Sequence, residues 1–402
     1  MFVEQSVARL WRVRLAFLSL CLFPAVGLGL WGLQRHSTAH RRDLTAAASR
    51  LLGVEVACSR VSHPRPGCIQ LAGLQVGGRP LGAAEVEATP TEVRLQIDRL
   101  ACDAAAVPLL AALGRRWLAE PRQFPRNCVI EVANLAWESP AADPPRRLRI
   151  ECVAAGGGRA VRLVTAGQAT NEIRIVHTPQ PADPARDRWE VLATLAEPLP
   201  AAIVVAAAAP SPLSDWRLGG AATVAGTVRA VAVGGDWAGE ATGRLEAIDL
   251  AAATKPLAQR AEGLASLDLA SLLWAANRLT AAEVVLTSPR GRLASQWLDG
   301  MVGLIGCRGA TADIRSAEAM VEYERLGLRL ECDRSGARIR AEPQRAGCLV
   351  ESQGLPLLYQ PRAAVTLDRL AWLFSGTRPA AVPGTPVSAW MLSVLPLPQA
   401  SR

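Results

Sequence analysis

The most constraining feature of the sequence is a run of nineteen residues without a charged side chain, Leu15–Leu33. A helix of this length spans about 28 Å, close to the ~30 Å hydrocarbon core of a bilayer. Trp11 and Trp31 lie near its ends, where interfacial aromatic side chains are common. The run predicts one transmembrane helix at residues 15–33, after a short cytoplasmic head at residues 1–14.

A cleaved signal peptide is the alternative interpretation of this run. The run is longer than the apolar region of a typical signal peptide, about 7–15 residues. The nearest resemblance to a cleavage site is the weak one at Ser37, Thr38 and Ala39. We favour a retained anchor. Three arginines precede the run and three follow it closely, so the positive-inside rule is nearly balanced. Because a short head needs no export, we expect a single-pass protein of the inner (cytoplasmic) membrane with its C-terminal body in the periplasm.

The charge distribution argues against a nucleic-acid partner. The net charge is +8, but residues 1–42 hold six arginines and one glutamate and so contribute +5, which leaves +3 for the other 360 residues. The basic excess flanks the apolar run, where anionic headgroups of the bilayer attract it. We therefore expect the lipid bilayer, and no nucleic acid, as a partner.

Beyond the anchor, alternating apolar and polar residues predict strands. The clearest case is Glu92–Leu100, in which Val93, Leu95 and Ile97 share one face. Similar segments, separated by turns rich in Pro, Gly, Asp and Asn, recur along most of the chain. No regular alternation of strands with helices is present, so the predicted fold class is mainly antiparallel β with a few short helices (α+β), preceded by one transmembrane helix.

A few segments favour helices. Residues 43–52 predict a helix with Asp43 as its N-cap, and Pro108 opens another in which Leu109, Leu113 and Trp117 share a face. Further helices are expected at 264–279, 291–304, 366–374 and 387–395. The strands at 221–228 and 229–233 are expected to be separate.

These signals divide the chain into regions. After the head and the anchor, we expect a juxtamembrane helix at 34–52, a first β region at 53–195 and a proline-bounded helical crossover at 196–217. A second β region with inserted helices is expected at 218–352, followed by a C-terminal helical tail at 353–402.

Eight of the nine cysteines lie beyond the anchor. An even number permits disulfides in an oxidising compartment. Cys58 and Cys68 flank one predicted turn, and Cys332 and Cys348 flank another, so each pair is a candidate disulfide. The alternative, in which these cysteines are small buried residues of strands, stays open.

Signals of catalysis and of bound cofactors are absent from the sequence. There is no CxxC, no phosphate-binding loop, no GxSxG and no HExxH motif. The four histidines are scattered; His63 is read as a turn residue and His177 as the end of a strand. We expect no enzyme, no catalytic residue, no cofactor and no metal site.

The start of the exported part resembles AsmA-like and TamB-like envelope proteins. A basic head and one span are followed by a helix that ends in Leu51, Leu52 and Gly53, by a strand at 54–61, and by the spacing Ile69-x-Leu71-x-Gly73-Leu74-x-Val76. The resemblance covers residues 1–100 best and weakens beyond them, and this chain is much shorter than the larger members. It carries no catalytic residues over.

The resemblance implies an elongated, curved sheet or β-groove with an apolar concave face. Such proteins are associated with lipid transport or envelope biogenesis between two membranes, so phospholipid acyl chains and other envelope proteins are the expected partners. The residues expected to line the groove are Ile69, Leu71, Leu74, Val76, Val93, Leu95 and Ile97, with Gly73 forming a bulge. The alternative function is that of a structural envelope scaffold that binds protein partners through a sheet with a closed core.

Overall fold

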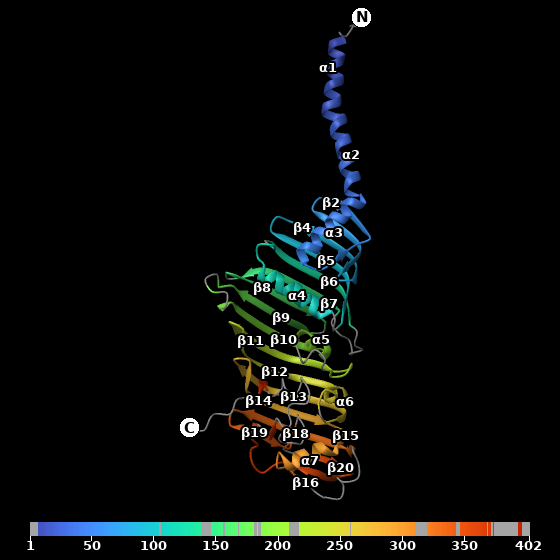
Figure 1. Ribbon diagram of the computed structural model, residues 1–402. Helices are drawn as coiled ribbons and strands as arrows, with labels where there is room; N and C mark the ends of the chain where they lie inside the picture. The colour runs from blue at the N-terminus through green and yellow to red at the C-terminus, as the bar shows by residue number, and fades with distance from the viewer. Residues whose placement is uncertain are drawn as a thin grey trace. The chain divides into compact units, whose positions relative to one another are not determined.

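The structure is a computed structural model of the full chain (Figure 1). It describes residues 7–103, 106–124, 126–137, 146–155, 157–167, 169–180, 183, 186–208, 217–257, 259–309, 320–342, 346–367, 369–370, 373 and 393–395. The contacts within the chain divide it into two compact units. Unit 1 is Met1–Leu100 with Ile130–Val132, and unit 2 is Ala101–Val129 with Ala133–Arg402.

Unit 1 begins with the predicted apolar helix. The helix runs through α1 (Val7–Phe17), the π-helical turn η1 (Leu18–Leu22) and α2 (Phe23–Arg35). Its segment Leu10–Arg35 has 26 residues and is long and apolar enough to cross a membrane. Arg35 stacks on Trp31 at 4.0 Å, so the charged end of the helix folds back over an aromatic ring.

The juxtamembrane helix α3 (Thr38–Leu52) is longer than the predicted helix at 43–52. Its N-cap is Ser37, whose side chain accepts a hydrogen bond from the backbone N–H of His40, and not Asp43. Gly53 ends the helix with a left-handed conformation (φ 69°).

The strands of unit 1 form an antiparallel ladder. They are β1 (Val56–Ala57), β2 (Arg60–Arg65), β3 (Cys68–Val76), β4 (Arg79–Ala88) and β5 (Glu92–Cys102), whose residues up to Leu100 belong to this unit. Strand β3 pairs with β1, β2 and β4, and β4 pairs with β5.

Unit 2 is built on a longer antiparallel sheet. Its first elements are α4 (Ala106–Ala119), β6 (Asn127–Trp137), β7 (Arg147–Ala155), β8 (Gly158–Ala166), β9 (Thr170–Thr178), β10 (Arg188–Pro200), α5 (Ala201–Ala208), β11 (Thr223–Val233), β12 (Asp236–Asp249), α6 (Leu250–Thr254), β13 (Ala261–Ala275) and β14 (Arg278–Ser288). From β7 to β14 each strand pairs with the next one along the chain. Figure 1 shows these strands side by side, with α4 lying across β8 and β9.

The last part of unit 2 adds a second layer. It contains β15 (Gly291–Ala294), α7 (Ser295–Gly303), β16 (Arg308–Gly309), β17 (Met320–Tyr323), β18 (Arg325–Asp333), β19 (Gly336–Arg340), β20 (Cys348–Ser352) and β21 (Leu355–Tyr359). Strand β18 continues the main sheet by pairing with β14 and β19, whereas β15 and β17 form a small sheet with the start of β13.

The coarse fold prediction is confirmed: the body is mostly antiparallel sheet with a few helices and follows one apolar N-terminal helix. Several element predictions are wrong. Residues 264–279 form most of β13, a turn and the start of β14. The prediction failed because β13 contains a register shift between Leu269 and Ser271, which gives its leucines a helix-like spacing. The predicted helix at 291–304 is instead β15 followed by α7, and residues 223–233 form one strand, β11. Most of the predicted tail helices, 366–374 and 387–395, lie outside the described residues.

Candidate functional site

One row of apolar side chains crosses ten strands of unit 2. Each residue of the row is the registered partner of the next. The row consists of Ile150, Leu163, Ile173, Ala193, Val228, Ala241, Leu272, Ala282, Cys332 and Ala337. At ~4.8 Å between strands, the row extends over roughly 43 Å. We call the face that carries it the apolar face.

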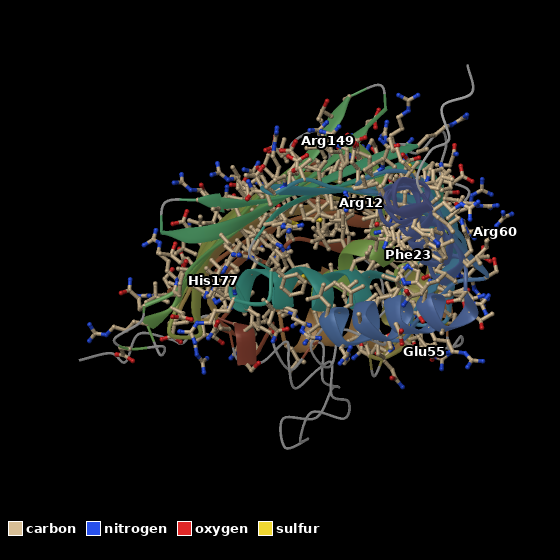
Figure 2. The ribbon with its side chains drawn as sticks, turned by 90° about the horizontal axis from the view of Figure 1, so that it is seen from above. Arg12, Phe23, Glu55, Arg60, Arg149 and His177 are labelled. Carbon is tan, nitrogen blue, oxygen red and sulfur yellow. The ribbon has the colours of Figure 1, made fainter. Side chains whose placement is uncertain are left out.

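The opposite face carries charge. The row one residue away includes Glu151, Arg162, Arg174, Arg229, Glu240 and Asp333. Ion pairs link neighbouring positions of this charged face, such as Arg162–Glu172 at 2.8 Å and Arg244–Asp268 at 3.2 Å. Figure 2 shows Arg149 pointing away from α4. The sheet is therefore amphipathic, and only one of its faces offers an apolar surface.

The apolar face is shallow and partly open where small side chains line it. Ala193 on β10 and Val228 on β11 are only half-buried, and Gly243 follows them on β12. Only glycine fits at position 243, because a Cβ there would lie 2.4 Å from the carbonyl oxygen of Ala225. We call this half-buried part of the apolar face, on β10 and β11, the trough.

At its far end the same face is covered by a closed core. The buried cluster includes Ala282, Cys332 and Ala337 of the row, and residues from other elements pack on them. The covering residues come from α6, α7, β20, β21 and the segment after β21, and they include Leu250, Leu298, Met301, Leu349, Leu358 and Val365. From β14 onward, the apolar face is therefore an ordinary protein interior.

At its near end the face is covered by a single helix, α4. Trp117 and Leu118 of α4 are buried against Cys152 of β7 and Val161 of β8, and Ile150, Leu163 and Ile175 pack around them. The opposite end of α4 is held by Asp103, whose Oδ1 accepts a hydrogen bond of 2.7 Å from the backbone N–H of Ala106. Thus α4 occupies the apolar surface of β7–β9.

Arg159 of β8 binds the C-terminal end of α4. Its guanidinium donates to the carbonyl oxygens of Trp117 and Pro121, both at 3.1 Å, and to that of Phe124. It also lies 4.4 Å from the centroid of the Trp117 ring. A cation at the C-terminal end of a helix satisfies its free carbonyl groups and its dipole, so this contact stabilises the docked helix.

His177 of β9 makes the second polar contact with α4. Its side chain is buried, its Nδ1 lies 3.2 Å from the carbonyl oxygen of Leu118, and its Nε2 lies 3.1 Å from Oδ2 of Asp187. The ring stacks on Trp189 with a centroid distance of 4.2 Å. Figure 2 shows His177 beside one end of α4. A hydrogen bond from the backbone N–H of Gln180 and the contact with His177 lower the pKa of Asp187.

The predicted groove residues lie together on one face of unit 1. Ile69 pairs with Val86, which pairs with Leu95, and Leu71 pairs with Ala84, which pairs with Ile97. Val93, Leu74 and Val76 belong to the same set of strands; Leu74, Val76 and Ile97 are buried, and the other four are half-buried. That this face holds a ligand stays a prediction.

The predicted bulge at Gly73 is confirmed. The register shifts between Leu71 and Leu74, and Gly73 has a φ of 57°. A Cβ at this position would lie 2.7 Å from Oγ of Ser59, so both the backbone conformation and the space favour glycine.

The four cysteines of the predicted disulfides are free thiols in the structure. The ladder places Arg65 and Glu87 opposite Cys68, Ala282 and Ala337 opposite Cys332, and Tyr359 opposite Cys348. Cys68 donates to Oε1 of Glu85 at 3.1 Å, and burial raises the pKa of Cys332 to about 11. Burial also raises the pKa of Cys58. Cys68 and Cys332 are buried and Cys58 and Cys348 are half-buried, and a disulfide in either pair stays a prediction.

Sequence reasoning missed the residues that hold α4. It placed Leu109, Leu113 and Trp117 on one helical face, but it assigned no role to Arg159 and read His177 only as the end of a strand. The spacing of a strand cannot show which helix will lie across it. Within the described part of the chain, no three His, Cys, Asp or Glu side chains gather as a metal site requires.

Comparison of the chain with protein-family models, with curated proteins and with solved structures finds no match.

Proposed function

We propose that this chain is a single-pass protein of the inner membrane whose exported sheet holds phospholipid acyl chains in the trough of unit 2. The observation that carries the proposal is the half-buried part of the apolar row on β10 and β11, opposite a charged face. Acyl chains fill a trough of small side chains without requiring polar partners. The role is lipid handling or envelope biogenesis between membranes, and it needs no catalytic residue.

The resemblance of residues 1–100 to AsmA-like and TamB-like proteins supports this assignment. An apolar helix that can span a bilayer precedes the sheet in the sequence. A protein anchored by this helix has membrane phospholipids close to its N-terminal end. A body in the periplasm follows from the expected orientation. A phosphatase fused to the C-terminus tests that orientation: it is active if the body is exported, and an inactive fusion beside an active cytoplasmic reporter contradicts it.

Two adjacent substitutions on β10 test the trough. Ala193→Arg places a charge in the half-buried row, whereas Leu192→Arg places the same charge on the opposite face, where Leu192 is 49% exposed. Each variant is extracted gently and examined by native mass spectrometry, and photoreactive phospholipid is used to label the sheet. We expect lipid on the wild type and on Leu192→Arg, and much less on Ala193→Arg. Absence of co-purifying lipid and of labelling in the wild type would refute the proposal.

A structural scaffold that binds protein partners is the second candidate. The specific observation in its favour is the buried core over β14, β18 and β19, in which Ala282, Cys332 and Ala337 are covered by other elements of the chain. If the wild type retains no lipid but a defined envelope protein is crosslinked to the sheet, the scaffold function is the better account.

A further inference from the structure

Helix α4 covers apolar surface of the kind that the trough offers to acyl chains. The residues beneath it, Ile150, Cys152, Val161, Leu163 and Ile175, lie on the same face of the same sheet as Ala193 and Val228. Two of them, Ile150 and Leu163, begin the apolar row itself. If α4 were lifted, the exposed trough would extend by the width of β7–β9.

We propose that the surface beneath α4 is a second acyl-chain subsite, which α4 occupies in the closed state and uncovers when His177 loses its proton. This inference rests on the proposed lipid function. It assigns α4 two roles: a cover for the empty site, and a competitor of the acyl chain for the same apolar side chains.

Both polar neighbours of the His177 ring are hydrogen-bond acceptors. The carbonyl oxygen of Leu118 and the carboxylate of Asp187 can only accept hydrogen bonds, so both contacts are satisfied together only when both ring nitrogens carry a proton. Neutral imidazole has one N–H, and its other nitrogen then faces an acceptor with a lone pair. Because the charged carboxylate is the stronger acceptor, the single N–H of neutral imidazole stays with Asp187, and the contact with the Leu118 carbonyl of α4 is the one that is lost.

The charged groups around His177 are consistent with this role. Asp187, at the start of the partner strand, supplies the carboxylate, and Gln180 holds its other oxygen through a backbone N–H at 2.8 Å. Arg159 is the registered partner of His177 on β8, but its guanidinium points to the carbonyl groups at the end of α4. From β10 the ring meets Trp189, and from α4 it meets the Leu118 carbonyl.

Arg159 makes the opening partial. Guanidinium groups stay protonated throughout the physiological range, so the three carbonyl contacts of Arg159 persist when the contact of His177 is lost. Arg159 keeps the carbonyl groups of Trp117 and of the segment after α4 in place, so loss of the His177 contact loosens the helix without detaching it. The expected direction is a cover that is tight at low pH and loose at high pH.

Hydrogen exchange of the full-length protein in nanodiscs tests the cover. The exchange of peptide 106–119 (α4) is compared with that of 295–303 (α7) at pH 5.5 and 8.5, on either side of the range in which imidazole titrates, after correction for intrinsic rates. We expect α4 of the wild type to open about tenfold more often at pH 8.5, since a charge-assisted hydrogen bond is lost, whereas α7 changes little.

Two variants and a control assign the response to His177. His177→Gln is neutral at both pH values, and Asp187→Asn, at a partly exposed position, removes the carboxylate with little risk to folding. Both should abolish the pH response of α4. His63→Gln, in unit 1, should keep it. Equal exchange of α4 at both pH values in the wild type, or an unchanged response in both variants, overturns the inference.

A binding measurement separates this inference from the proposed function. A phosphatidylcholine with a fluorescent polyene acyl chain is used, because its headgroup does not titrate between these pH values. We expect the wild type to bind several-fold more of it at pH 8.5, and His177→Gln to bind equally at both. If the probe binds but neither its binding nor α4 changes with pH, only the present inference fails. If no probe binds at either pH, the lipid function fails and the subsite with it, whatever α4 does.

Discussion

The two ends of the apolar row present the same strand pattern in different surroundings. On β8–β11 the residues Leu163, Ile173, Ala193 and Val228 are half-buried, whereas Ala337 on β19 has an exposed fraction of 0%. Both ends have alternating strands, antiparallel pairing and a charged opposite face. The difference lies in what packs on the row: several elements of the C-terminal part at one end, and α4 with the segment after it near the other.

This comparison separates two properties that a sheet can have. Alternation makes one face apolar, but only a covering layer turns that face into an interior. Where the cover is thick, the apolar face stabilises the fold. Where it is thin or held by few polar contacts, the same face is available to a ligand.

The strongest test of the comparison is a pair of leucine truncations. Leu349 (0% exposed) belongs to the closed core, and Leu195 is half-buried on the apolar face of β10. We expect Leu349→Ala to lower the free energy of unfolding by about 2–5 kcal/mol, because it leaves a cavity. Leu195→Ala should cost about 1 kcal/mol or less, because its site is only half-buried. Urea unfolding measures both, and equal losses would show that the two ends do not differ.

A hydroxyl deletion probes how the closed end is held. Tyr323 is buried, donates to the carbonyl oxygen of Glu262 at 3.1 Å and lies 2.8 Å from Oγ of Ser288. Tyr323→Phe should lower the free energy of unfolding by about 1–3 kcal/mol, because buried partners lose their hydrogen bond. Tyr359→Phe, at a half-buried ring, is the control and should stay within about 0.5 kcal/mol. A neutral Tyr323→Phe would argue against a tightly packed end.

A contact between two histidines in unit 1 is expected to respond to pH in the opposite direction to α4. His40 and His63 join α3 to β2 with their Nε2 atoms 3.2 Å apart. Burial, then Arg35, His40 and His36, lower the pKa of His63. Because the unfolded chain then binds the proton more readily, the contact is stable above about pH 6.5 and weakens as the pH falls toward the lowered pKa.

Hydrogen exchange of peptide 38–52 measures this effect. It should open more often at pH 5.5 than at pH 7.5, and His63→Gln should remove the difference. If α3 and α4 responded in the same direction, a general effect of pH would explain both, and the specific role of His177 would lose support.

The smallest effect is expected on the charged face. Arg162, near α4, pairs with Glu172 and Glu151, and Arg329, at the other end, pairs with Glu283 and Glu331. The side chains of Arg162 and Arg329 are 45% and 39% exposed, so Arg162→Gln and Arg329→Gln should each cost about 0.2–1 kcal/mol in urea unfolding. Similar small losses would confine the difference between the ends to the apolar face.

Features with a local cause were predictable from the sequence. The apolar helix follows from its composition, and strand β5 follows from its alternation of apolar and polar residues. The bulge at Gly73 follows from a break in the alternation of β3. Strand β13 was misread because its bulge after Leu269 places Leu272 three residues on, although Leu267, Leu269 and Leu272 share one face.

The candidate site was less predictable, because its parts are distant in sequence. Arg159 lies 42 residues from Trp117, and His177 lies 59 residues from Leu118. Their contacts depend on where α4 packs on the sheet, and the spacing of apolar residues does not predict that position. The groove was predicted on β3 and β5 of unit 1, whereas the longest apolar row belongs to unit 2.

The pairing order of unit 2 determines when each strand can find its partner during synthesis. From β8 to β14, every new strand meets a partner that has already been made, so the sheet can grow as the chain emerges. Strand β14 breaks this order, because its next partner, β18, begins 37 residues after Ser288 at Arg325. At about 5–20 residues per second, its edge stays unpaired for roughly 2–7 s. During that interval the edge of β14 can pair with a second nascent chain, so this is the stage at which a chaperone has most to protect.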